Sequence, residues 1–374
     1  MTAERQHCPG YPIPRAERPR IARRRPAGRR AVQALAAGAS LALLAACSSA
    51  ASDSSSITSG SDASSSFKGK TITLIAPDSP GGSYDSYARL FAPYVAQELG
   101  ATINVENVAG AGTLAGSNQM AAASPNGLTI GMVNVGADIA SKVEGQPTFN
   151  TDMAKVSWIG QPAVLPNALV SQPGSSAASF TSLTHASDPV PVLDIRNGIG
   201  DMLNRVVFGA FGIKHKLDSG FESTTALKQG FLAKDGLTIF EAMSTLYPLI
   251  SGHEAKPLLV TGSVSLPSYQ KVLAGVPTLD SELSKVSLSA QNDKAVKEAV
   301  ELSNLSDVFA APPGLPAAQL TALRQAFAKA ATLPALRKQA TKESLPLAFI
   351  SGATTASSVS SAVSNSSAIA PFVK

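Results

Sequence analysis

The chain has 374 residues with a formal net charge of +5, but nine arginines and two glutamates lie before Cys47. Of the 31 basic and 26 acidic residues in the chain, 22 basic and 24 acidic ones remain after that point. The later chain is therefore slightly acidic, which excludes reading the overall basic charge as a sign of nucleic-acid binding.

Residues 1–46 are typical of a bacterial signal peptide. Ala31–Ala46 is apolar and uncharged, follows an arginine pair, and is too short for a comfortable membrane span. Leu44-Ala45-Ala46-Cys47 looks like a lipobox, so we predict that Cys47 is lipidated and anchors the protein on the extracytoplasmic face of the cell membrane, in the periplasm or at the cell surface. A signal cleavage site that merely precedes a cysteine is the alternative. Sec and twin-arginine export both stay open.

Residues 47–67 are predicted to be a flexible tether, because 48–66 contains eleven serines and almost nothing apolar. Cys8 is lost with the signal peptide and Cys47 is lipidated, so the mature protein has no disulfide. The folded part is expected to begin near Lys68, and its length suffices for two lobes.

A first unit of alternating strands and helices follows the tether. The expected elements are, in order, strand 71–76, helix 84–99, strand 102–108, a short helix ending at Ala123, and strand 128–133. This order predicts a largely parallel sheet covered by helices.

A second unit of the same kind begins near Val190. We expect strand 190–195, a turn at 196–200, helix 201–211 with Asp201 as its N-cap, strand 237–243 and strand 257–261. Further on, 317–332 is predicted to be a surface helix, and the tail after Gly352 helical at best or frayed. The first lobe would comprise 68–171 and 262–374, and the second lobe 172–261.

Gly81-Gly82-Ser83-Tyr84-Asp85 lies between a predicted strand and the start of a predicted helix. Such a turn directs several backbone N–H groups to one place, and the helix dipole adds positive potential there. Glycine is expected here because a side chain would block the approach of a ligand to the backbone. Arg196 to Asp201 repeats the arrangement, so both turns are predicted to face one cleft at the carboxyl ends of parallel strands.

Five motifs in register resemble the Bug-type substrate-binding proteins of tripartite tricarboxylate transporters. They are Ile72–Asp85, Val105–Gly112, Pro125–Ile130, Val276–Leu279 and Phe309–Pro316. The resemblance covers about 69 to 345. It implies an α/β, two-lobed periplasmic-binding-protein (Venus flytrap, type II-like) fold with mixed, mostly parallel sheets flanked by helices. It also implies a small carboxylate ligand held by backbone amides and waters of two loops.

The resemblance and the turns together predict the ligand-binding residues. They are Gly81, Gly82, Ser83, Tyr84, Asp85, Arg196, Asn197, Gly198, Gly200, Asp201, Ser244 and Thr245. The second turn departs from the family's Gly/Ser-rich pattern. Arg196 either grips a second carboxylate or is a solvated loop residue. Asp85 either shapes its loop or meets an ammonium group of the ligand.

Other kinds of protein fit the sequence less well. Gly110-Ala111-Gly112-Thr113-Leu114-Ala115 matches a Rossmann fingerprint, but no acidic residue ends the next strand. A hydrolase would need a nucleophile elbow, which is missing, and the histidines are too scattered for a triad or a metal site. We therefore predict no enzyme, cofactor, metal or nucleic-acid partner.

The predicted function is that of a lipid-anchored, monomeric solute-binding protein. It would capture a small organic anion, such as a di- or tricarboxylate, and deliver it to membrane permease subunits. A surface lipoprotein that kept the fold but acts as a sensor or interaction partner is the alternative.

Overall fold

The structure, a computed structural model, describes residues 65–374. They belong to one compact unit. The predicted signal peptide, the predicted lipidation of Cys47 and nearly all of the predicted tether lie outside the described residues. A short 3-10 turn, η1 (Ser65–Phe67), begins the described part, and Phe67 is fully buried.

The first sheet has six strands in the order β11-β4-β10-β3-β1-β2. Their bounds are β1 (Thr71–Ala76), β2 (Thr102–Asn107), β3 (Thr129–Val133), β4 (Ser157–Gln161), β10 (Val308–Ala311) and β11 (Ile350–Ser351). The strands β1, β2 and β3 are parallel, with Leu74 opposite both Val105 and Ile130. Strand β10 returns antiparallel to both β3 and β4.

The second sheet has five strands in the order β7-β6-β8-β5-β9. Their bounds are β5 (Asn167–Ser171), β6 (Val190–Ile195), β7 (His215–Phe221), β8 (Thr238–Ala242) and β9 (Lys256–Val260). The strands β6, β7 and β8 are parallel, and β5 is antiparallel to β8 and β9. Both sheets are therefore mixed, with a parallel part in each that carries the predicted strand–turn–helix unit.

Two predicted lobe boundaries are wrong. Strand β5 was assigned to the first lobe, but it lies in the second sheet between β8 and β9. The chain also stays with the second lobe beyond Thr261, since Tyr269 of α9 (Pro267–Val272) packs its ring 5.2 Å from that of Tyr247. Strand pairing across a sheet is a long-range property, and neither segment carries a local signal of its sheet.

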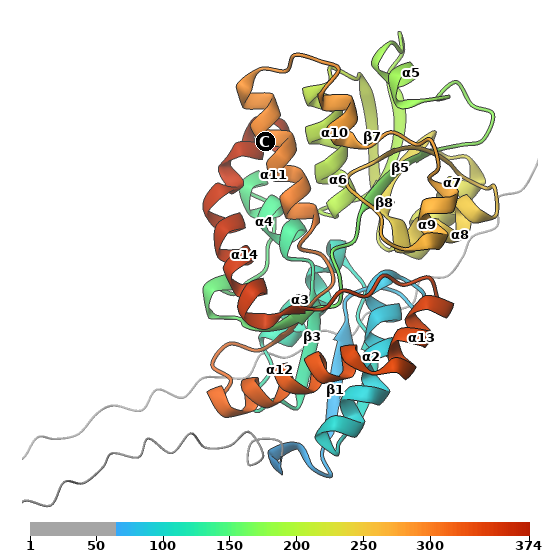
Figure 1. Cartoon of the computed structure of the whole chain (residues 1–374). Helices are drawn as coiled ribbons and strands as arrows, with labels where there is room; N and C mark the ends of the chain where they lie inside the picture. The colour runs from blue at the N-terminus through green and yellow to red at the C-terminus, as the bar shows by residue number, and fades with distance from the viewer. Residues whose placement is uncertain (1–64) are drawn as a thin grey trace, which may run out of the picture. The chain divides into compact units, whose positions relative to one another are not determined.

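Helices α2 (Ser83–Leu99), α12 (Ala317–Thr332) and α13 (Pro334–Lys342) cover one face of the first sheet (Figure 1). The rings of Phe91, Phe309 and Phe327 meet there, with centroids 4.6 to 5.8 Å apart. Gly100 ends α2 in a left-handed conformation, which glycine adopts readily at the end of a helix. The predicted bounds of β1, β6 and α12 agree with the structure.

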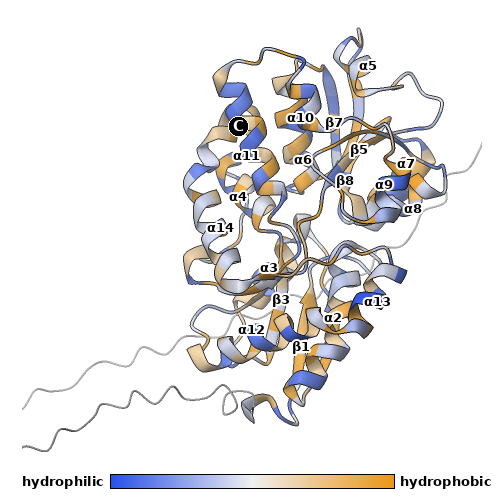
Figure 2. Cartoon of the chain, viewed as in Figure 1, coloured by the Kyte–Doolittle hydropathy of each residue, from blue (hydrophilic) through white to orange (hydrophobic). Residues whose placement is uncertain are grey.

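A shared hydrophobic cluster joins the two sheets. It includes Val133 and Val308 of the first sheet and Leu169 and Val192 of the second. The helices that contribute to it are α3 (Leu114–Ala121), α4 (Val135–Glu144), α5 (Phe180–Thr184), α6 (Ile199–Leu203), α10 (Leu279–Leu283), α11 (Ala290–Ser303), α14 (Gly352–Asn365) and α15 (Ala370–Val373). Figure 2 shows α11 with both hydrophilic and hydrophobic residues, as expected for a helix with one face buried. The tail after Gly352 is helical.

Helices α7 (Thr224–Ala233), α8 (Met243–Ser251) and α9 cover the other face of the second sheet. The helix predicted at 201–211 begins earlier and is irregular: α6 starts at Ile199, and a π-helical turn follows at Asn204–Phe208. Its N-cap is Gly198, so the prediction of Asp201 as N-cap is wrong. Among the residues from 65 onward, no helix combines the length and apolar character needed to cross a bilayer.

Candidate ligand-binding cleft

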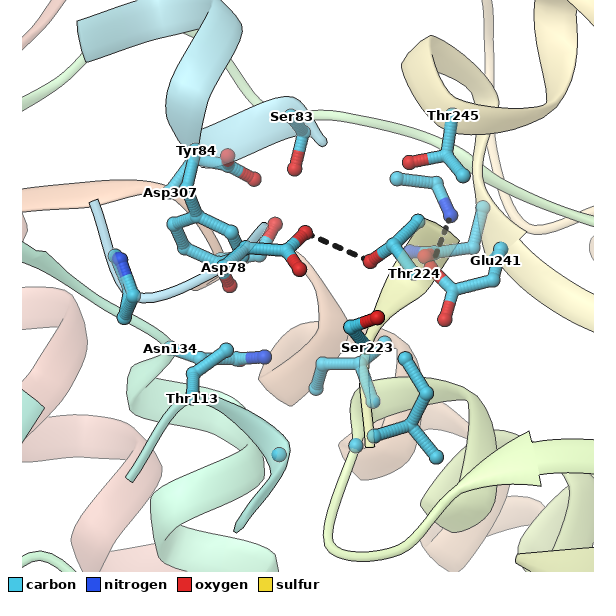
Figure 3. A pocket seen from close by; sticks show the side chains of 18 of the residues that line it. Asp78, Ser83, Tyr84, Thr113, Asn134, Ser223, Thr224, Glu241, Thr245 and Asp307 are labelled. Carbon is cyan, nitrogen blue, oxygen red and sulfur yellow. Dashed lines mark hydrogen bonds between the residues drawn. The ribbon is translucent and has the colours of Figure 1, made fainter. Parts of the chain in front are cut away.

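A polar cleft lies where loops of the first sheet meet loops of the second, and a cavity of about 50 Å³ remains in it. It is lined by Pro77, Asp78, Ser83, Tyr84, Gly112, Thr113, Asn134, Asn167, Ile195, Gly198, Ile199, Glu222, Ser223, Thr224, Glu241, Ala242, Thr245, Ser306 and Asp307. Figure 3 shows Asp78, Tyr84 and Asp307 on one side and Thr224, Glu241 and Thr245 opposite them.

The first-lobe wall is built on the start of α2. Gly82 is its N-cap and supplies no side-chain cap, so the first amides of the helix have neither an intrahelical acceptor nor a capping oxygen. Gly81 before it has a φ of +85°, a conformation that favours glycine. Ser83 and Tyr84 of the first turn line the cleft. This helix end therefore offers N–H donors, a hydroxyl and a positive dipole to a bound anion.

Asp78 lies against the same turn. Its Oδ1 accepts a hydrogen bond from the Ser79 amide at 2.7 Å. A Cβ added to Gly82 would collide with its carboxylate, so Gly82 leaves room for Asp78. The predicted reason for this glycine, ligand approach to the backbone, is thus replaced by contact with a side chain of the protein itself.

Asp307 comes directly before β10 and is 1% exposed. Its backbone has a φ of +54°. Neither carboxylate oxygen accepts a hydrogen bond of normal geometry, although both are buried. Burial raises the pKa of Asp307 to about 7, while the nearby hydroxyls of Ser83 and Ser306 act in the opposite direction.

The second-lobe wall is formed where strands of the second sheet end. Glu241 and Ala242 close β8 and lead into α8, from which Thr245 also reaches the cleft. Burial, and next to it the charge of Asp78, raise the pKa of Glu241 to about 7. Ser223 caps α7 by accepting a hydrogen bond from the Ala226 amide at 3.2 Å.

Direct contacts join the two walls. The Thr224 hydroxyl donates to Asp78 at 2.7 Å, and the Ser79 and Thr225 hydroxyls are 2.9 Å apart. A Cβ on Gly112 would lie 2.5 Å from the Arg196 carbonyl oxygen, so the Gly110–Gly112 turn touches the second turn backbone to backbone. The two lobes are therefore closed onto each other around the cavity.

The structure brings four of the predicted ligand-binding residues to the cleft: Ser83, Tyr84, Gly198 and Thr245. The others lie nearby without lining it: Gly81, Gly82, Asp85, Arg196, Asn197, Gly200, Asp201 and Ser244. Arg196 is exposed and borders a separate depression with Glu144 and Asp201. The structure therefore does not support the interpretation that Arg196 binds a second carboxylate. The alternative, that Arg196 is a solvated loop residue, agrees with its exposure.

Asp85 and Asp201 have internal partners instead of cleft-facing ones. Asp85 accepts from the Gly81 amide at 2.9 Å and pairs with Arg89 at 2.8 Å. Asp201 pairs with Arg205 at 3.2 Å and is 1% exposed. Asp85 thus shapes its loop, in agreement with one of the two alternatives for this residue.

The predicted ligand-binding residues include none of the four carboxylates that line the cleft. Asn134 directly follows β3, and Asp78 lies two residues beyond the end of β1; polar residues at the carboxyl ends of parallel strands are a usable signal. Glu241 lies inside the predicted strand 237–243. No local signal marks Asp307, because β10 enters the first sheet antiparallel from a distant part of the chain.

No family model matches the chain. A UPF0065 protein of Bordetella pertussis is 27% identical over 279 residues, which cover 72% of this chain and 79% of that protein. BugT of the same organism is 30% identical over 121 residues, 31% of this chain and 36% of BugT.

Solved structures share the fold. The periplasmic binding protein BugD aligns with a TM-score of 0.65 at 18% identity, over 80% of this chain and 95% of BugD. MatC from Rhodopseudomonas palustris, solved with bound malate, gives 0.64 at 18% identity over 80% of this chain and 99% of MatC. A TctC solute-binding protein from Polaromonas aligns with a TM-score of 0.54 at 18% identity, over 79% of this chain and 97% of that protein. In sequence and in fold, the chain is therefore similar to UPF0065 and Bug-type periplasmic binding proteins.

Proposed function

We propose that this protein captures a small organic anion in the cleft between its lobes and delivers it to the permease subunits of a tripartite tricarboxylate-type transporter. The observation that carries the proposal is the uncapped start of α2, which opens into a cleft bounded by both lobes. A carboxylate of the ligand would accept hydrogen bonds from the first amides of α2 and from Ser83.

The ligand would stabilise the closed form by touching both walls. Ser83 and Tyr84 belong to the first lobe and Thr245 to the second, so a molecule between them adds contacts that the open form lacks. Residues 162–166 join β4 of the first sheet to β5 of the second and would take part in the hinge. Closure is the signal that the permease would read.

The relatives support a carboxylate as the ligand class. MatC was solved with malate, and another R. palustris protein with this fold was solved with adipate, at a TM-score of 0.66 and 16% identity. Both ligands carry two carboxylates. The lipid anchor at Cys47 and action as a monomer complete the proposal; they rest on the sequence alone.

A thermal-shift screen of mono-, di- and tricarboxylates and amino acids tests the proposal. A ligand at 100 times its Kd adds about 2.7 kcal/mol to the free energy of unfolding, which is a readily measured shift in Tm. We expect at least one carboxylate to produce it. A folded protein that responds to no member of a broad panel would contradict the proposal.

A further inference from the structure

The cleft holds an excess of negative charge. Asp78, Glu222, Glu241 and Asp307 line it, while none of its described lining residues is Lys, Arg or His. Like charges at close range in a poorly solvated site repel strongly. A ligand with two or three carboxylates and no positive group would add to this repulsion.

The four carboxylates differ in how well the protein itself satisfies them. Asp78 accepts from Ser79 and Thr224, and Glu241 accepts from the Ala242 amide at 3.3 Å. Glu222 is exposed to solvent. Asp307 is almost completely buried, and neither of its oxygens accepts a hydrogen bond of normal geometry, although the Ser83 and Ser306 hydroxyls lie near the carboxylate. A buried, unpartnered carboxylate is costly, so its place in a binding cleft indicates a partner supplied by the ligand.

Charge repulsion also acts across the gap between the lobes. Burial is the largest cause of the raised pKa of Glu241 in the second lobe. The charges of Asp78 and Asp307 in the first lobe raise this pKa further, and the charge of Lys228 on α7 lowers it. Tyr84 and Asp138 are further titratable groups that interact with this cluster of charges from the side of the first lobe. Closing the lobes brings these charges together, so a cation between them would favour closure.

We infer that the ligand is an amino-acid-like zwitterion, whose ammonium group binds at Asp307 with Asp78 and Glu241 close by, while its carboxylate occupies the start of α2. This inference rests on the proposed function, since it concerns the other end of the same ligand. A protonated primary amine suits the site because its three N–H donors match carboxylate acceptors.

A metal ion fits the site less well. In the part of the chain from residue 65, no group of three or more acidic, histidine or cysteine side chains is arranged to hold one. A quaternary ammonium group would call for an aromatic cage, and Tyr84 is the sole aromatic residue of the cleft lining. The primary ammonium group remains the best match.

Isothermal titration of matched pairs tests this inference. Each pair consists of an amino acid and its deaminated counterpart: aspartate and succinate, glutamate and glutarate, 4-aminobutyrate and butyrate. Diamines without a carboxylate complete the panel. We expect an amino acid to bind, and its deaminated counterpart to bind with an affinity lower by a factor of about 30 or more.

The pH dependence gives a second readout. Binding of an ammonium group favours ionised Asp307 and Glu241, so affinity should rise as pH increases from 6 to 8 through their pKa values of about 7. A dicarboxylate would need the protonated carboxyls as donors, and its affinity should fall over the same range.

Variants identify the residue that meets the ammonium group. Asp307→Asn should lower the affinity for the amino acid about 30-fold and leave the affinity for the deaminated counterpart unchanged or higher. Glu298→Gln is the matched control, because Glu298 is also a buried acid with an unpartnered oxygen but lies on α11 outside the cleft lining. If Asp307→Asn does not fold, Glu241→Gln replaces it as the test variant.

The outcomes separate this inference from the proposed function. A deaminated acid that binds as tightly as its amino acid, and more weakly at high pH, overturns the zwitterion and leaves the carboxylate site intact. Binding of diamines alone supports the ammonium site and overturns the proposed carboxylate seat. A folded protein that binds neither class overturns both.

Discussion

The turns that follow β1 and β6 share a pattern but perform different tasks. Each has an aspartate four residues before the glycine N-cap of its helix: Asp78 before Gly82, and Asp194 before Gly198. Asp78 turns to the cleft and accepts from Thr224 of the opposite lobe. Asp194 is fully buried and accepts from Asn204 of its own lobe. Equivalent positions therefore contact the opposite lobe in one case and their own lobe in the other.

The helices behind the two turns differ as well. Helix α2 runs for 17 residues, whereas α6 has five and passes into a π-helical turn. A long regular helix projects its dipole and free amides into the cleft more effectively than a short one. On this basis we propose that the first lobe holds the anionic end of the ligand and that the second lobe mainly completes the enclosure.

The largest effect should follow from separating the two turns. In Gly112→Ala, the new Cβ would meet the carbonyl groups of Arg196 and Asn197, so the lobes cannot close fully. We expect affinity for the ligand to fall about 100-fold, or about 2.7 kcal/mol. Isothermal titration measures it.

Gly145→Ala is the control for this variant. Gly145 also has a positive φ, +74°, but open space where the Cβ would be added. Both variants bear the cost of a left-handed alanine, and only Gly112→Ala should lose affinity. Equal affinities in the two variants would show that the turns need not meet for binding.

Removal of the two aspartates should separate stability from binding. Asp194→Ala leaves the buried Asn204 amide without its acceptor and should lower the free energy of unfolding by about 2 kcal/mol. Asp78→Ala, at the cavity between the lobes, should cost less stability but weaken binding of the ligand about 10-fold through lost contact between the lobes. Denaturant unfolding and titration of both variants measure this; a reversed pattern would contradict the assigned roles.

A smaller effect is expected for Ser83→Ala. The loss of one hydroxyl hydrogen bond to the ligand's carboxylate should weaken binding about 5- to 10-fold. Ser86→Ala is a matched serine on α2, whose hydroxyl donates to the Gly82 carbonyl at 2.9 Å instead of facing the cleft. Similar losses in both variants would point to an effect on the helix rather than on the ligand.

The smallest effect should come from the second turn. Arg196→Ala removes an exposed side chain outside the cleft lining, so affinity should change by less than about 2-fold for any ligand. The test includes a dicarboxylate, because a large loss for that ligand alone would restore Arg196 as a binding residue and restore a direct role for the second turn.

Local patterns in the sequence determined the elements that carry the first wall. The short apolar run Thr71–Ala76, the glycines at 81 and 82 and the apolar stripe of the following helix are short-range features, and β1 and α2 agree with them. The same holds for β6. Five motifs in register were enough to predict the fold and the similarity to Bug-type proteins, because their order reflects one fold.

Only the tertiary structure decided which side chains line the cleft. Asp307 directly precedes β10, which pairs antiparallel with β3, a strand far away in sequence. Glu241 lies near the end of β8. Arg196 and Asp201 matched the expected chemistry but turn away from the cleft, since the backbone of the second turn packs against Gly112. Side-chain direction and strand order depend on contacts between distant segments, which no local pattern in the sequence records.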